Sequence, residues 1–465
     1  MLTHVIFFKV PPRGTGISGW RLISARRAGA WLALLLAACA SATAAPPASS
    51  PAVAPPIAAT ASVSIGAVGD VLMHAAVKQS AAEHRSAGDE GGYGWLWAPV
   101  SDLLAETDVT FANLETPVAP RTGSETRSFV FNADPAAVKA LKRSGVNIVS
   151  VANNHIFDQG RAGFEETIAE LDRLGMAYVG AGEPDHESGP RVVTVQGIRI
   201  AFLGYARFFN QSGNDCPPQA RRACVKASLL DPDRAVAEVR AAAASADAVV
   251  VSLHWGDEYA PQPRPDDVTL AHRLVEAGAL VVLGHHPHVL QPIELYRRAD
   301  GTTALIAYSL GNFVSNQSRN YVHAVTPEPV GATRDAVLLR AQIARRDYGR
   351  GVARVELVGA GWLPLWTEND TVDPVRRVSG KRPSIRVVSL DRALADVRAE
   401  LRSLADPLPA QDRARYVVLR QREELYVARR AAIAAAVGED LEREAPPWPV
   451  RPGGTTAPIT PAASR

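Results

Sequence analysis

The sequence of 465 residues is 47% hydrophobic and 21% charged, which is ordinary for a globular protein and excludes a small disulfide-stapled scaffold. Five basic residues and no acidic ones lie in residues 1–38, so the formal charge of +2 for the whole chain becomes −3 for the rest. A slightly acidic body argues against a nucleic-acid-binding protein, which needs a basic surface to engage phosphates.

Residues 1–38 have the pattern of a signal peptide. Arg26 and Arg27 precede an uncharged run, Ala28–Ala40, which is shorter than the roughly 20 residues of a membrane-spanning helix. Leu36–Cys39 resembles a bacterial lipobox, so we expect acylation at Cys39 and a protein anchored to the cell-envelope membrane. The alternative is plain cleavage near Ala42–Ala44, which would release a soluble periplasmic protein.

Residues 39–62 are expected to form a tether, because this stretch is rich in Pro and Ala and carries no charge. The other two cysteines, Cys216 and Cys224, lie in a polar segment, and in an exported protein they are expected to form a local disulfide. A cysteine-based metal site is the alternative, but no histidine lies nearby in the sequence.

Six short apolar runs predict buried strands, and each leads into a polar motif. The runs are Val63–Val68, Asp108–Phe111, Val146–Val151, Ala248–Leu253, Ala279–Leu283 and Ala304–Ala307. The polar residues that follow them include Asp70, Asn113, Glu115, Asn154, His155, His254, His286, His288 and Asn312.

Helices are predicted between these strands. One begins after the Asp134 cap and closes at Gly145, and others cover Arg161–Leu174 and Asp266–Ala277. This alternation favours a layered α/β fold. Val192–Tyr205 predicts a hairpin that turns at Gln196–Gly197, so the sheets should be mixed.

The pattern thins beyond about Gly361. Leu390–Leu404 and Gln411–Val437 predict amphipathic helices, so a mostly helical extension is expected over residues 366–444. Residues 445–465 are rich in Pro, Ala, Thr and Gly, and they are expected to be disordered.

The polar motifs predict a metal centre, because the carboxyl ends of neighbouring strands meet at one edge of a sheet. Imidazole, carboxylate and amide groups suit Zn²⁺, Mn²⁺ or Fe²⁺. Two such ions can generate a hydroxide and clamp the oxygens of a displacement, and His155 would suit a general acid. The expected ligands are Asp70, Glu115, Asn154, His254, His286 and His288, with His74, Asn113 and Asn312 as further candidates. His285 is expected to be a packed or hydrogen-bonded neighbour, with a metal ligand as the alternative. Asp158 is expected to shape the loop after His155.

Six segments resemble the CapA family of capsule, or poly-γ-glutamate, synthesis proteins. They are GDVLMH (69–74), FANLETPV (111–118), VSVANNHIFDQG (149–160), HWGDEY (254–259), GHHPHVLQPIE (284–294) and YSLGNFV (308–314). That family is similar in turn to calcineurin-like metallophosphoesterases. The resemblance implies a four-layer α/β/β/α sandwich with mixed sheets over residues 63–365.

By this resemblance, one metal ion would be held by Asp70, Glu115 and His288. The second would share Glu115 and add Asn154, His254 and His286. Leu72 stands where the phosphoesterase Asp-x-His motif has its histidine, and Glu115 replaces a bridging aspartate. Metal binding is therefore better supported than phosphoesterase chemistry.

The resemblance implies a metal-dependent hydrolase of the cell envelope that acts in capsule or poly-γ-glutamate biosynthesis or export. Its expected partners are an anionic polymer and other capsule-synthesis subunits. The chain has no GxxxxGK[ST] loop, so it is not expected to ligate glutamates with ATP by itself. Two alternatives are a non-catalytic assembly or polymer-binding subunit with a structural metal site, and a general periplasmic metallophosphatase.

Overall fold

The computed structural model describes residues 58–183, 189–217, 224–370, 383–438, 441 and 460–461. All of them belong to one compact unit. The expected signal peptide, Cys39 and the tether up to residue 57 lie outside the described residues, as does most of the expected C-terminal tail.

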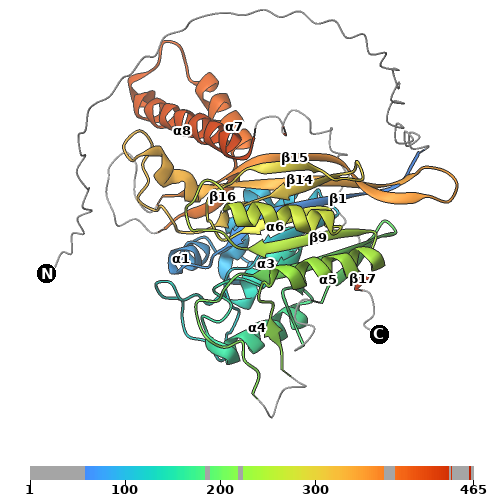
Figure 1. Cartoon of the computed structure of the whole chain (residues 1–465). Coiled ribbons are helices and arrows are strands. Elements are labelled where there is room, and N and C mark those ends of the chain that lie inside the picture. The colour runs from blue at the N-terminus through green and yellow to red at the C-terminus, as the bar shows by residue number, and fades with distance from the viewer. Residues whose placement is uncertain are drawn as a thin grey trace, which may run out of the picture. The chain divides into compact units, whose positions relative to one another are not determined.

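The first sheet has eight strands within the described residues (Figure 1). Its parallel half consists of β1 (Ala58–Val71), β2 (Val109–Asn113), β3 (Val146–Ser150) and β4 (Ala177–Val179). On the other side of β1, the sheet continues antiparallel through β14 (Asp335–Asp347), β15 (Ala353–Asn369) and β16 (Ile385–Ser389). The short β13 (Asn312–Val314) pairs in parallel with the end of β1.

The second sheet has seven strands in the described part of the chain. Its order is β11 (Ile293–Arg297), β12 (Thr303–Ala307), β10 (Val281–His285), β9 (Ala248–His254), β7 (Ile198–Ala206), β6 (Arg191–Val195) and β17 (Thr460–Pro461). The four central strands are parallel and the outer ones antiparallel, so both sheets are mixed, as predicted. A separate two-stranded ladder joins β5 (Ala181–Gly182) to β8 (Lys226–Ala227).

The two sheets pack face to face, and helices cover both outer faces. The inner core joins residues of both sheets, including Phe111 of β2 and Phe202 of β7, whose rings stack at 6.2 Å. The outer face of the first sheet is covered by α1 (Ala75–Glu83), α2 (Ser101–Ala105), α3 (Pro135–Arg143) and α4 (Gly160–Leu174), with the 3₁₀ turns η1 (Glu90–Leu96) and η2 (Ala98–Val100). The second is covered by α5 (Pro232–Ser245) and α6 (Pro265–Glu276). This confirms the predicted α/β/β/α, metallophosphoesterase-like fold.

Local sequence signals explain several element ends. The Asp134 side chain accepts a hydrogen bond from the Ala136 amide at the start of α3, as an N-cap should. Gly175 ends α4 in the left-handed conformation with φ 60°. The β6–β7 turn has positive φ at both Gln196 and Gly197, which matches the twist of a tight hairpin and confirms that prediction.

Three features differ from the sequence-based expectation. β1 begins at Ala58 instead of Val63, so residues 58–62 of the expected tether are strand, paired with the far end of β14. The strands β14–β16 were not predicted, and β15 runs through the expected boundary at residue 365. Two residues of the expected tail form β17 on the edge of the second sheet. These pairings are long-range, so no local pattern reveals them.

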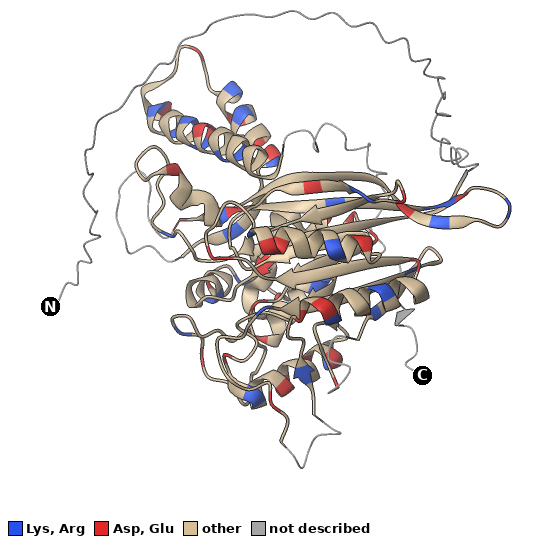
Figure 2. Ribbon diagram, in the orientation of Figure 1, with Lys and Arg blue, Asp and Glu red and all other residues tan. Residues whose placement is uncertain are grey.

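The predicted C-terminal helices are present as α7 (Leu390–Ser403) and α8 (Arg413–Val437), which follow β16 and the short η5 (Ala410–Asp412). Apolar residues of both helices, such as Leu394 and Ile433, join the inner core together with Trp362 and Trp366 of β15. Basic and acidic residues both occur along α7 and α8 (Figure 2). Among the described helices, none combines the length and apolar character needed to cross a bilayer.

A buried ion-pair network fixes α8 to the sheet. Arg429 is 2% exposed, and its guanidinium donates to the Asp335 carboxylate, with 3.0 Å from Nε to Oδ1, and to Glu328 Oε2 at 2.9 Å. Asp335 begins β14, and Glu328 begins the 3₁₀ segment η4 (Glu328–Arg334). Burial raises the pKa of Asp335 to about 6 despite Arg429 beside it. The arginine therefore compensates a charge that the interior disfavours.

Replacing Arg429 with methionine should lower the free energy of unfolding by about 3–5 kcal/mol, because the Asp335 charge is left buried and unpaired. Denaturant unfolding measures this loss as a lower midpoint. Arg430→Met is the matched control, since Arg430 pairs with Asp391 at the surface and its loss should cost less than about 1 kcal/mol. Equal midpoint shifts for the two variants would contradict the structural role given to Arg429.

Candidate metal centre

The ends of strands from both sheets meet at one buried site. Asp70 is the second-last residue of β1, Asn113 ends β2, and His254 ends β9. The loops that follow β2, β3 and β10 add further polar side chains. The structure thereby brings together all six expected ligands, each no more than 3% exposed: Asp70, Glu115, Asn154, His254, His286 and His288.

Glu115 is the most unusual of these residues. Its side chain is fully buried, and neither carboxylate oxygen has a hydrogen-bond partner within the described residues. Oε1 lies 3.5 Å from His254 Nε2 and 3.8 Å from His288 Nε2. Burial and the nearby Asp70 carboxylate raise the pKa of Glu115 well above its ordinary value. A buried carboxylate without donors is costly, and a bound cation would remove that cost.

Asp70 lies at the other side of the site and is well supplied with donors. Its Oδ1 accepts from Asn113 Nδ2 at 2.8 Å and lies 3.3 Å from His285 Nδ1. Its Oδ2 lies 3.1 Å from His288 Nδ1. Burial opposes ionisation, but the hydrogen bonds from His285 and His288 hold the pKa of Asp70 well below its ordinary value. Asp70 is therefore a carboxylate at neutral pH.

Amide side chains position the histidines. Asn312 Oδ1 lies 3.0 Å from His288 Nδ1, while its Nδ2 donates to the Thr333 carbonyl oxygen, which fixes the amide. Asn113 Nδ2 contacts His254 Nδ1 at 3.3 Å, and Asn154 Oδ1 lies 2.9 Å from His254 Nε2. Asn312 and Asn113 thus contact candidate ligands directly, and Asn312 can orient His288.

Two of the candidate ligand histidines, His254 and His286, are held in the neutral state. Burial lowers the pKa of His254 well below its ordinary value, and the nearby His286 adds to this effect. Burial also lowers the pKa of His286 to about 4, with a further contribution from His288. A neutral imidazole is the form that binds a metal ion, so these rings are prepared for coordination at neutral pH.

The backbone around the site is strained and closely packed. His286 and His288 have φ of 97° and 58°, a conformation that costs about 1–3 kcal/mol in a residue with a side chain and that clusters at functional sites. Gly69 and Gly284 precede the ligands, and a Cβ on either would lie within 2 Å of a carbonyl oxygen of a neighbouring segment. Only glycine allows these chains to approach so closely.

Three sets of side chains can hold a metal ion. Each set offers one ligand atom per residue, and these atoms lie within 4.8 Å of one another. The three sets are Asp70 with Glu115 and His288, Glu115 with His254 and His286, and Glu258 with His286 and His288. The first two sets share Glu115, so its carboxylate is placed to bridge two ions. His74 belongs to none of the sets, and its Nδ1 accepts from the Asn316 amide at 3.3 Å.

His155 lies beside the centre, outside the three sets. Its Nδ1 donates to Asp158 Oδ2 at 2.8 Å, and the Asp158 side chain is completely buried. The ring of Phe131 lies between those of His155 and His74, with centroids 4.5 and 4.8 Å away. Asp158 holds the His155 ring in one orientation and tautomer, which leaves Nε2 to exchange a proton with a ligand.

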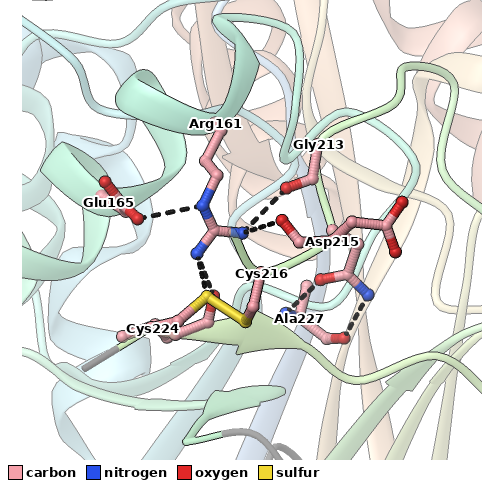
Figure 3. The surroundings of a disulfide bond; sticks show 9 residues. Arg161, Glu165, Gly213, Asp215, Cys216, Cys224 and Ala227 are labelled. Carbon is pink, nitrogen blue, oxygen red and sulfur yellow. Dashed lines mark hydrogen bonds and ion pairs between the residues drawn. A yellow bond between two sulfur atoms is a disulfide. The ribbon is translucent and has the colours of Figure 1, made fainter. Parts of the chain in front are cut away.

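The segment after β7 forms one wall of the site. Phe208 meets the ring of His286 edge-on at 5.2 Å, and the Asn210 amide donates to the Asn154 carbonyl oxygen at 2.8 Å. The structure places Cys216 and Cys224 in a disulfide farther along this segment (Figure 3). Arg161, at the start of α4, donates to the Gly213 and Val225 carbonyl oxygens on either side of the disulfide. This clamp ties the wall to the loop that carries His155.

Some residues of the site were missed or given no part in its chemistry by the sequence analysis. His285 contacts Asp70 as a neighbour of the site, in line with the expectation, whereas Asp158 orients His155 instead of merely shaping the loop. Asn153 donates to the Leu114 carbonyl oxygen at 2.9 Å and so supports the loop before Glu115. The His-x-x-Asp spacing at His155 is the one local signal that would have indicated such a pair.

The buried charge of Glu115 leads to a test by thermal unfolding. In the presence of a chelator, Glu115→Gln should be at least as stable as the wild-type protein, because glutamine is neutral without taking up a proton or an ion at this buried position beside Asp70. Mn²⁺ at about 100 times its dissociation constant should stabilise the wild type by about 2.7 kcal/mol and should leave the variant almost unchanged. Glu125→Gln, at a side chain that is 93% exposed, should respond to Mn²⁺ like the wild type. Full Mn²⁺ stabilisation of Glu115→Gln would contradict this site.

Comparison with known proteins identifies the family of this chain. Residues 64–317 match the family described as bacterial capsule synthesis protein PGA_cap. The chain is 30% identical over 335 residues to the capsule biosynthesis protein CapA of Bacillus anthracis, which covers 70% of this chain and 72% of that protein. It is 29% identical to the PGA biosynthesis protein CapA of Bacillus subtilis (70% and 76% covered), and 34% identical to a probable polyglutamine synthesis accessory protein of Mycobacterium tuberculosis (44% and 56% covered). The matched residues carry every strand end of the site, and the chain belongs to the bacterial capsule synthesis (CapA) family.

Proposed function

We propose that this protein acts in the synthesis or export of a capsular polymer, poly-γ-glutamate or a similar polyanion, through a two-metal, hydrolase-like centre. The similarity to the capsule and PGA biosynthesis proteins of the two Bacillus species supports the capsule role. The observation that carries the chemical part concerns Glu115. Among the described residues, its buried carboxylate has no hydrogen-bond partner, and it is shared by two sets of side chains that could hold a metal ion.

The residues fit a pair of divalent ions. Asp70, Glu115 and His288 would hold one ion, while Asn154, His254 and His286 would hold the other together with Glu115. Bound at such a site, two ions activate a water molecule and stabilise the charge that develops on a phosphoryl or acyl group. The chain itself contributes the neutral imidazoles, a site closed to bulk water, and the amides that hold the ligands in place.

His155 would serve as the general acid. Asp158 accepts a hydrogen bond from Nδ1–H and would stabilise the doubly protonated ring, whose Nε2–H could then deliver its proton to the leaving group. Phe131 packs against the ring and restricts its motion. A positioned acid of this kind contributes about 10²–10⁴-fold to a rate.

Export and membrane attachment are part of the same proposal. The Arg26–Arg27 flank, the apolar run and the lipobox-like Cys39 support secretion with a lipid anchor. The disulfide between Cys216 and Cys224 supports an oxidising compartment, because cytosolic thiols are kept reduced. Other capsule-synthesis subunits and the anionic polymer would then be its partners at the envelope.

Replacing His155 with glutamine tests the catalytic role. The wild-type protein loaded with Mn²⁺ should cleave an alkyl phosphodiester, whose alkoxide leaving group needs a proton, or shorten poly-γ-glutamate. The variant should do so about 10²–10⁴-fold more slowly because the leaving group is no longer protonated. Its metal content should be unchanged, since His155 lies outside the metal-binding sets.

His84→Gln is the matched control, because His84 stacks on Trp95 at 4.1 Å and has no part in the site. Its activity should equal that of the wild type. Equal activities of His155→Gln and the wild type would refute the role of His155. If the wild-type protein binds Mn²⁺ and poly-γ-glutamate but cleaves neither the phosphodiester nor the polymer, the protein is a polymer-binding subunit and not an enzyme.

A further inference from the structure

The segment after β9 places a third carboxylate at the mouth of the metal centre. Glu258 lies in the loop that follows His254, and its side chain is exposed. One of its carboxylate oxygens and one ring nitrogen each of His286 and His288 lie within 4.8 Å of one another. Atoms bound to one ion at about 2.0–2.2 Å are at most about 4.4 Å apart, so a small rotation of the Glu258 side chain suffices.

The loop that carries Glu258 is held rigidly against the His-Pro-His segment. The Trp255 amide donates to the His285 carbonyl oxygen at 3.1 Å, and the Tyr259 amide donates to that of Pro287 at 2.8 Å. Tyr259 has φ of 62°, a costly conformation for a bulky residue, and its ring lies 6.2 Å from that of His288. Two tight contacts and a strained residue thus keep the backbone of Glu258 over the centre.

Within the described residues, the centre also has nitrogen and oxygen atoms that could bind a metal ion and that have no hydrogen-bond partner in the protein. His286 is 3% exposed, and its Nδ1 is buried without a hydrogen-bond partner. Both oxygens of Glu115 are in the same state. The set of Asp70, Glu115 and His288 offers three ligands. Leu72 stands where an Asp-x-His motif would add a histidine, and its side chain is buried and apolar, so it cannot supply a fourth ligand.

We infer that Glu258 is a further metal ligand of this centre, which binds from the solvent side to the ion held by His288 and so compensates for the histidine absent at Leu72. The inference rests on the proposed metal-dependent function. It has a chemical consequence, since a site with Asp70, Glu115 and Glu258 has three carboxylates around the bridged ion. Carboxylate-rich sites suit Mn²⁺, whereas imidazole suits Zn²⁺.

Titration calorimetry of the chelator-treated full-length protein with Mn²⁺ tests this assignment. The wild type should bind two ions, and Glu258→Gln should weaken one of the two sites by at least about tenfold, the lower limit reported for groups that merely support a ligand. The visible spectrum of the Co²⁺ form should change as well, because a ligand is lost. Asp257→Asn is the matched control, with the same change of charge one residue away on the same loop, and it should leave both readouts unaltered.

The possible results separate the inference from the proposed function. If Glu258→Gln binds Mn²⁺ and Co²⁺ like the wild type, Glu258 is not a ligand, while the two-metal centre stands. Equal weakening by Glu258→Gln and Asp257→Asn would mean that negative charge near the mouth acts at a distance, and it would also overturn the inference. A wild-type protein that binds neither ion would remove the proposed function and the inference together.

Discussion

The structure depends on a buried carboxylate, Glu115, to which the described part of the protein provides no hydrogen bond. Glu115 and Asp70 are both fully buried at one site, and the described chain supplies hydrogen bonds only to Asp70. Folding two carboxylates into a dry pocket is unfavourable unless positive charge joins them. The imidazoles of His254 and His286 do not supply it, because burial keeps both of them neutral. Divalent cations would make this arrangement stable.

The fold serves to assemble this pocket from distant parts of the chain. The carboxyl ends of β1 and β2 in one sheet face those of β9 and β10 in the other, so the ligands meet between the sheets. Further contacts hold each ligand from behind. Asn312 links His288 to the Thr333 carbonyl oxygen, and two residues later Asp335 forms the buried ion pair with Arg429 of α8. The C-terminal helix therefore packs on the segment that supports the site.

The sequence predicted the parts of the fold in which local chemistry decides the structure. The strands before Asp70 and His254, the Asp134 cap and the Gln196–Gly197 turn all have short-range signals, and they are present. The β14–β15–β16 extension was missed, since its strands are defined by pairing with β1 and with one another. For the site, the residue types at strand ends sufficed to select the six candidate ligands, and the structure brings them together.

What the sequence could not provide is the orientation of side chains. The proximity of His285 to Asp70, the bond from His155 to Asp158 and the position of Glu258 beside the His-Pro-His segment follow from tertiary packing and strained backbone. Of these features, only the His155–Asp158 pair has a local signal in the sequence, which is its His-x-x-Asp spacing. They are also the features that separate a cluster of polar loop residues from a site with assigned chemical roles.

The most direct test of the central claim is anomalous X-ray diffraction from crystals of the protein grown with Mn²⁺. We expect two anomalous peaks roughly 3.5–4 Å apart. One should lie among Asp70, Glu115 and His288, and the other among Glu115, Asn154, His254 and His286, with Glu115 between them. A pocket without anomalous density, in crystals that contain Mn²⁺ and keep this fold, would contradict the account.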